Sequence, residues 1–119
     1  MKNLLSVLIA IIILASCQLT TGSGNIVSET RTVNNFSEIS VGNSFDVEVK
    51  IGPVTEVRVE ADDNVIKYIN TSVSDKTLKI RIDDDYSFSN AHLKIYITTP
   101  VLTEIITSGS ASVIVKDVI

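Results

Sequence analysis

The sequence predicts a mainly β fold, and three observations lead to that expectation. Apolar and polar residues alternate with a period of two in several segments, which is the pattern of half-buried strands. Glycine, proline and short polar turns separate these segments. Near the C-terminus a run of small residues, 108–112, lies between short apolar segments. Small residues at such bends let the coils of a β-solenoid stack closely, so we expect a β-solenoid-like domain with an antiparallel N-terminal hairpin and one short helix.

The first residues have the pattern of a bacterial signal peptide that ends at a lipidation site. Lys2 precedes an apolar run at 4–14, which is shorter than the ~20 residues that a membrane-spanning helix needs. The run closes with Leu-Ala-Ser-Cys, and the chain has only this one cysteine. We therefore expect residues 1–16 to be cleaved between Ser16 and Cys17. Acyl chains on Cys17 would then anchor the mature protein to a membrane.

The remainder divides into a tether and one small domain. Residues 18–25 are rich in glycine, serine and threonine, so residues 17–25 are predicted to be the lipidated cysteine and a flexible tether. Residues 26–119 suffice for one domain without a disulfide. The formal net charge is −4 with no clustered basic face, which argues against nucleic acid as a partner.

Two alternating segments in the first half of the domain are strand candidates. Residues 45–51 place Phe, Val, Val and Ile on one face and charged residues on the other. Gly52-Pro53 interrupts the pattern, which resumes at 57–60. The sequence therefore predicts that these two strands pair as an antiparallel hairpin.

A short helix and two further strands follow. Asp62, Asp63 and Asn64 are residues that cap helices, and the apolar spacing in 65–69 suits one or two helical turns. Residues 78–83 and 93–98 alternate as strands, whereas the polar segment 84–90 is predicted to be a loop.

Five segments in a fixed order carry a family resemblance. They are Gly24-Asn25-Ile26 with Val33, FSEISVGNSFDVEVKIG at 36–52, VRVEADDNVIKYI at 57–69, LKIRI at 78–82 and LKIYITTPVLTEIITSGSASV at 93–113. The set resembles the head GIN domain family of bacterial envelope lipoproteins, which carries the label "putative auto-transporter adhesin". The resemblance implies a right-handed parallel β-helix over residues 26–119, with further Gly-Ser-Gly coils after the last residue of this chain. We therefore expect a chain truncated after its first coils, and the resemblance assigns no site residues.

The residues offer little chemistry for a metal or a cofactor. Asp83, Asp84 and Asp85 are the densest carboxylate cluster, but an EF-hand reading from Asp83 puts Phe88 where glycine is required and Lys94 where glutamate is required. We expect a solvated loop and no metal site there. No nucleotide-binding glycine loop occurs in the sequence, so no cofactor is expected.

Catalytic and aromatic candidates are equally few. His92 is the only histidine, and neither a G-x-S-x-G nor an H-E-x-x-H motif accompanies it, so we expect a solvent-facing residue and no catalytic one. Tyr86, Phe88 and Tyr96 are open to two readings. They either stack on sugars or pack within the fold, with Phe88 under its loop and Tyr96 as a cross-strand partner.

These observations favour a lipid-anchored envelope protein, not an enzyme, with a β-solenoid surface that binds a protein or glycan. We expect it on the periplasmic face of the outer membrane, with surface exposure as the alternative. One competing hypothesis is a polysaccharide-active enzyme that uses Asp83 to Asp85, Lys94 and Arg81. Another is a periplasmic scaffold in which residues 113–119 capture a partner strand.

Overall fold

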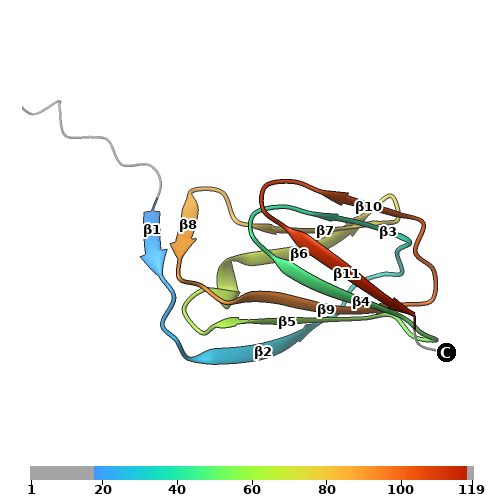
Figure 1. The fold of residues 1–119 in the computed structure, drawn as a ribbon, viewed down its shortest axis with the longest axis horizontal. Coiled ribbons are helices and arrows are strands. Elements are labelled where there is room, and N and C mark those ends of the chain that lie inside the picture. The colour runs from blue at the N-terminus through green and yellow to red at the C-terminus, as the bar shows by residue number, and fades with distance from the viewer. Residues whose placement is uncertain (1–17, 118–119) are drawn as a thin grey trace, which may run out of the picture.

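The computed structural model describes residues 18–117, and within them strands dominate (Figure 1). The mainly β prediction is confirmed. The predicted signal peptide, the cleavage position at Ser16 and the lipidation site at Cys17 lie outside the described residues. Among those that are described, no helix is long and apolar enough to cross a membrane.

Within residues 18–117 the strands form three sheets. Their order is β11-β4-β9-β5-β2 in the largest, β10-β3-β7-β6 in the second and β1-β8 in the smallest. The strands are β1 (Gln18–Thr21), β2 (Ile26–Arg31), β3 (Glu38–Val41), β4 (Asp46–Ile51), β5 (Glu56–Asp62), β6 (Ile69–Ser74), β7 (Thr77–Ile82), β8 (Tyr86–Ser89), β9 (Leu93–Thr99), β10 (Glu104–Thr107) and β11 (Ser112–Asp117), with one 3-10 helix, η2 (Ile66–Tyr68), between β5 and β6.

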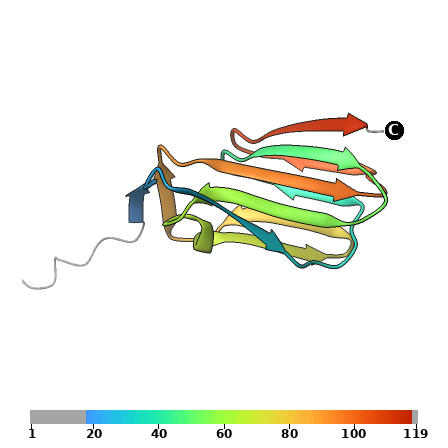
Figure 2. The ribbon, with the colours of Figure 1, turned by 90° about the horizontal axis from the view of Figure 1, so that it is seen from below.

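The two larger sheets form two layers with the core between them (Figure 2). Alternation explains this, because the buried apolar residues of β4, β5, β7 and β9 recur at every second position, as in Val47 and Val49 of β4 and Ile95 and Ile97 of β9. The fully buried aromatic Phe45 lies at the turn that leads from one layer to the other. The largest fully buried aliphatic side chains are Ile39, Leu78, Ile80, Ile95 and Ile97.

Three strand pairs repeat one path from the smaller layer to the larger one. They are β3 with β4, β7 with β9, and β10 with β11, and we call each pair a coil. Neighbouring coils are parallel in both sheets. The first coil lies in the middle, with the second on one side of it and the third on the other. The coils are therefore stacked, although not in chain order.

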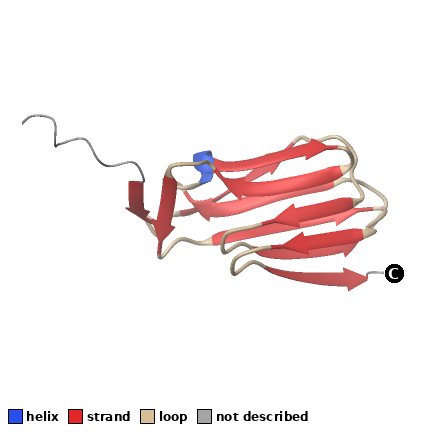
Figure 3. Ribbon diagram, turned by 90° about the horizontal axis from the view of Figure 1, so that it is seen from above, coloured by secondary structure: helices blue, strands red, loops and turns tan. Residues whose placement is uncertain are grey.

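Antiparallel strands complete both layers beyond the second coil. β5 pairs with β9 and β2 pairs with β5, while β6 pairs with β7. Strand arrows of opposite direction accordingly lie next to each other in Figure 3. The sheets are consequently mixed, which differs from the purely parallel winding that the family resemblance implies.

The tight turn predicted at 108–112 joins β10 to β11 and lies against the turn of the first coil. Gly109 has φ +64°, and a Cβ atom there would approach the carbonyl oxygen of Asn43 to 2.9 Å. The backbone N–H of Ser110 donates to that same oxygen at 2.9 Å. Small residues are needed here because the two turns approach each other backbone to backbone.

The predicted hairpin between residues 45–51 and 57–60 is wrong in its pairing. Both segments are strands, but β9 lies between β4 and β5 and pairs with each of them. Gly52 to Thr55 connects the two, and this loop passes over one strand position instead of closing a two-residue turn. A Gly-Pro connection lacks the Asn-Gly geometry that fixes a tight hairpin.

Two segments predicted to be irregular are strands. Residues 18–21 form β1 and residues 86–89 form β8, and the two strands pair in parallel. The expected flexible tether is therefore wrong for 18–21, and the expected loop is wrong for 86–89. Each strand is short and lacks a long alternating pattern, so the pairing arises from a contact between distant parts of the chain.

The predicted helix is confirmed as the single turn η2, but its predicted cap is wrong. The residue before the helix is Val65, and no side chain caps its N-terminus. The side chains of Asp62 and Asp63 bind the N-terminal segment instead, as described next.

Candidate functional site

The N-terminal segment, residues 18–25, is held to the domain by an acidic corner formed by Asp62, Asp63 and Asn64. Asp62 is only 2% exposed and accepts two backbone hydrogen bonds, from Gly24 at 2.9 Å and from His92 at 2.6 Å. Burial raises the pKa of Asp62, but these N–H donors outweigh it and keep the pKa below the ordinary 3.8. A buried carboxylate therefore joins the N-terminal segment to the start of β9.

The other two residues of the acidic corner act at the surface. Asp63 accepts from the Ser23 hydroxyl at 2.6 Å and from the Asn25 amide at 2.8 Å, and these two bonds lower its pKa. Asn64 accepts from the Ser23 backbone at 3.0 Å and donates to the Thr21 carbonyl at 3.0 Å. All three side chains are occupied by the N-terminal segment, which explains their presence without a ligand.

Three aromatic side chains gather beside β8. The rings of Tyr68 and Tyr86 stack with centroids 4.1 Å apart, and Phe88 lies 5.8 Å from Tyr68. Tyr86 and Phe88 are partly buried against the core, so Phe88 packs into the fold as one of the two readings expected. These aromatic residues join β8 to the 3-10 helix η2.

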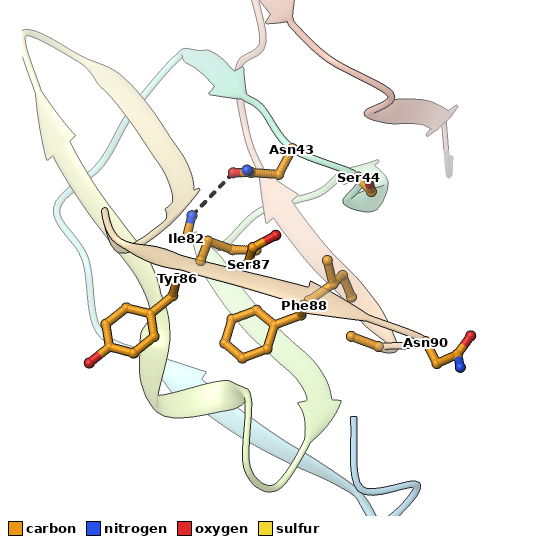
Figure 4. Close-up of a pocket in the computed structure, with 9 residues that line it drawn as sticks. Asn43, Ser44, Ile82, Tyr86, Ser87, Phe88 and Asn90 are labelled. Carbon is orange, nitrogen blue, oxygen red and sulfur yellow. Dashed lines mark hydrogen bonds between the residues drawn. The ribbon is translucent and has the colours of Figure 1, made fainter. Parts of the chain in front are cut away.

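An open hollow of about 300 Å³ lies beside the same strand (Figure 4). The Asn43 side chain turns inward there and accepts the backbone N–H of Ile82 at 3.2 Å, while Asn90 lies at the far end of β8. The lining residues are Asn43, Ser44, Ile82, Tyr86, Ser87, Phe88, Asn90, Ala91 and Leu93.

The hollow offers hydroxyl and amide groups beside a phenyl ring, which suits a small polar molecule and supplies no acid-base pair. The pKa of Tyr86 is raised, mainly by the adjacent Tyr68 and further by Asp83 and Asp85. Its hydroxyl consequently stays protonated near neutral pH and cannot serve as a base.

The structure does not bring Asp83, Asp84 and Asp85 together. Asp83 accepts from the Asn70 amide, and Asp84 accepts from Arg81 at 3.2 Å. Asp85 occupies the turn with φ +73°. Within residues 18–117 no group of three or more His, Cys, Asp and Glu side chains is placed to hold a metal ion.

The cluster required for the enzyme hypothesis is also dispersed. Arg81 lies on β7 in the four-stranded sheet, whereas Lys94 lies on β9 in the five-stranded sheet. His92 is 44% exposed, as expected for a surface residue, and its Nε2 lies 2.9 Å from the carboxylate of Glu60.

The outer face of the five-stranded sheet carries a row of charges that pair with one another. Arg58 lies over the ring of Tyr96 at 4.1 Å, directly across the strand pair, so the cross-strand reading of Tyr96 is confirmed. Arg58 also lies 3.6 Å from Glu60, and Lys116 lies 3.6 Å from Glu48. Such exposed pairs form a solvated face.

The third coil forms an exposed edge, and the strand-capture hypothesis places part of it at residues 113–119 without foreseeing the contribution of β10. Within the described residues β10 and β11 are each the last strand of their sheet. Ile106, Ile114 and Val115 are 48%, 58% and 45% exposed. We call this surface the third-coil edge. The sequence indicates this edge because residues 113–115 are all apolar, so the outward-facing position between the two valines carries no charge.

Comparison with known families and structures agrees with this fold. The family model described as "Putative auto-transporter adhesin, head GIN domain" matches residues 35–119. A structure from Parabacteroides distasonis, described as a putative lipid binding protein, is 26% identical with a TM-score of 0.75. A putative adhesin from Bacteroides fragilis is 25% identical with a TM-score of 0.74, and one from Parabacteroides merdae is 18% identical with the same TM-score.

These structures are longer than this chain. The alignments cover 83%, 81% and 83% of this chain, but only 44%, 45% and 42% of the three structures. Comparison of the sequence with curated proteins gives no match. Because the family model covers most of the sequence, this chain belongs to the family described as putative auto-transporter adhesin, head GIN domain.

Proposed function

We propose that this chain is a lipid-anchored, non-catalytic binding module of the cell envelope, and that the complete protein winds further coils onto the third-coil edge. The family and the adhesins of similar fold support a role in binding rather than catalysis. The Leu-Ala-Ser-Cys motif that ends at Cys17 supports lipid anchoring, and we place the anchor in the outer membrane, on its periplasmic face or at the cell surface. The ligand class expected for such a module is a protein or a glycan.

The observation that carries this proposal is the stack of three coils whose apolar interior is uncovered on one side. Ile105, Val113 and Val115 align with the buried Ile39, Val47 and Val49 of the first coil, so they face the same interior. Val115 nevertheless remains 45% exposed. A further coil would bury these side chains at about 25 cal/mol per Å² of apolar surface.

A right-handed solenoid is the arrangement we propose for the complete protein. Crossover connections between parallel strands of one sheet are almost always right-handed. The similar structures are more than twice as long as the part that this chain matches, which leaves room for the added coils.

The test compares this chain with the same chain extended by any downstream coding sequence. Both proteins, processed at Cys17, are melted by circular dichroism and screened on glycan arrays and against envelope proteins. We expect the extended protein to melt at higher temperature and to bind a ligand without turning it over. Turnover of a glycan that Asp84→Ala with Asp85→Ala abolishes would contradict the proposal.

Capture of a partner strand is a second candidate function, and the third-coil edge favours it. An exposed edge strand presents unpaired N–H and C=O groups that can pair with another chain. Ile114→Lys places a charge on that edge, and the control Lys50→Ala changes the neighbouring strand without altering the edge. Strand capture requires that Ile114→Lys abolish self-association or partner binding in light scattering, and unchanged association would reject it.

A further inference from the structure

The position of β1 determines the orientation that the domain would have relative to a membrane. Gln18 pairs with Tyr86 and Thr21 pairs with Ser89, and the Gly22 N–H continues this ladder to the Ser89 carbonyl at 3.0 Å. The chain is thus bound to the domain from the residue that follows Cys17. A free tether of eight residues would instead give a separation of about 15 Å.

The β1–β8 sheet lies across one end of the long strands (Figure 1, blue and orange). β7 ends just before β8 and β9 begins just after it, so this is the end at which the second coil passes from one layer to the other. The turn between β6 and β7 lies at the opposite end of the same strands. A strand of six residues separates the two ends by about 20 Å.

The surface of the β1–β8 sheet fits the interface of a bilayer. Leu19 is 71% exposed, and its register partner Ser87 is exposed beside it. Tyr68 and Tyr86 stack on the other face of β8, and Lys67 lies 5.3 Å from the Tyr68 ring. Because Tyr86 packs against the core, this stack holds β8 in place, and the opposite face presents the exposed Leu19 beside Ser87 to the bilayer.

The charged side chains at this end of the domain indicate which lipid headgroups it would contact. Asp84 and Asp85 are exposed in the turn that leads into β8, and Asp84 pairs with Arg81 at 3.2 Å. Strongly anionic headgroups would repel these carboxylates, whereas a phosphatidylethanolamine surface would not.

We propose that the β1–β8 end contacts a zwitterionic phospholipid surface with Leu19 in the interface. The long strands are then perpendicular to the membrane plane, and the coils stack parallel to it. This inference rests on the proposed lipidation of Cys17. Because stacking is perpendicular to the strands, each added coil would extend the protein along the membrane instead of away from it.

The experiment measures the depth of four labels on acylated protein in phosphatidylethanolamine-rich vesicles. Cys17 is consumed by acylation, so each introduced cysteine is the only free thiol. Ser87→Cys and Ser74→Cys mark the two ends of the strands near β8 and near the β6–β7 turn. Ser110→Cys and Glu104→Cys mark the two ends of the third coil. Each carries a fluorophore, and lipids with spin-labelled headgroups quench it according to depth.

We expect quenching at positions 87 and 110 to exceed quenching at 74 and 104 severalfold. Leu19→Ser, which changes an exposed side chain only, should reduce quenching at 87. Equal quenching within each pair, or stronger quenching at 74 and 104, would overturn the inference. Intact mass separates the two proposals, because a protein without acyl chains refutes the anchor itself, while an acylated protein with equal quenching refutes only the orientation.

Discussion

Gly24 donates its backbone N–H to the buried carboxylate of Asp62 at 2.9 Å, and this bond links two segments that are 38 positions apart in the chain. The same carboxylate accepts from the N–H of His92 at 2.6 Å. One side chain therefore determines the positions of the N-terminal segment and the start of β9 together. The acidic corner is a structural centre of the fold rather than a ligand site.

Replacing Asp62 with asparagine should destabilise the domain. The amide offers one acceptor oxygen in place of two, and its NH₂ group would face an N–H donor. Hydrogen bonds to a charged group contribute about 1.5–3 kcal/mol, so we expect a loss of about 2 kcal/mol in the free energy of unfolding. Urea denaturation measures it. The exposed Asp75→Asn is the matched control, and equal stability of the two variants would refute the assignment.

The same residue makes stability depend on pH in a defined direction. The pKa of Asp62 is lowered in the folded protein from its ordinary 3.8, so ionised Asp62 stabilises the fold fully above that value. The contribution disappears as the pH falls through the lowered pKa. The difference in melting temperature between the protein and Asp62→Asn should therefore shrink below about pH 4. A difference that stays constant down to pH 2 would contradict this linkage.

The close contact between the β3–β4 turn and the β10–β11 turn predicts that the stability of the domain depends on Gly109. Gly109→Ala would place a Cβ atom 2.9 Å from the Asn43 carbonyl oxygen and would also require a side chain at φ +64°. Gly24→Ala is the control, because Gly24 has φ +89° with nothing within 4 Å of the added atom. The left-handed backbone alone costs about 1–2 kcal/mol in both variants. Thermal melts should show a larger loss for Gly109→Ala, and equal losses would exclude the close approach as the cause.

A third prediction concerns the stabilising role of Arg31 on β2, which is the strand of the five-stranded sheet farthest from the third-coil edge. Its guanidinium donates to the carbonyls of Ile69 at 2.8 Å and Ile66 at 3.1 Å, so it joins β2 to the segment around η2. Lysine cannot reproduce this forked geometry. We expect Arg31→Lys to lose about 1–3 kcal/mol of unfolding free energy. The half-exposed Arg58→Lys should lose less than about 1 kcal/mol, since exposed pairs contribute little.

The sequence predicts the strands of this fold better than it predicts their partners. Alternation located β4, β5, β7 and β9, because burial on one face imposes a period of two. Pairing depends on contacts between distant residues, so β9 could enter between β4 and β5 without any local sign. For the same reason the pairing of β1 with β8 was not predicted.

For the candidate site too, the sequence predicted which residues matter better than it predicted their partners. The sequence identified Asp62 and Asp63 as side chains with a structural role, since short acidic residues bind nearby backbone N–H groups. It assigned them to the wrong partner, because a helix cap is local whereas Ser23 and Gly24 are distant. The separation of Arg81 and Lys94 onto different sheets also depends on topology alone.

Gly22 offers the sharpest test of whether the N-terminal segment is part of the folded domain. A Cβ atom at this position would lie 2.7 Å from the carbonyl oxygen of Asn90 and 2.7 Å from the Asp62 carboxylate. Both neighbours are fixed, so Gly22→Ala should detach β1 from β8 while the two larger sheets persist. Hydrogen exchange is expected to accelerate at residues 19–24 and 86–89 and to stay unchanged in β4 and β9. Ser23→Ala, which removes one surface hydrogen bond, is the milder control. Unchanged protection of β8 in Gly22→Ala would show that β1 does not hold it, and the N-terminal segment would then be a flexible tether after all.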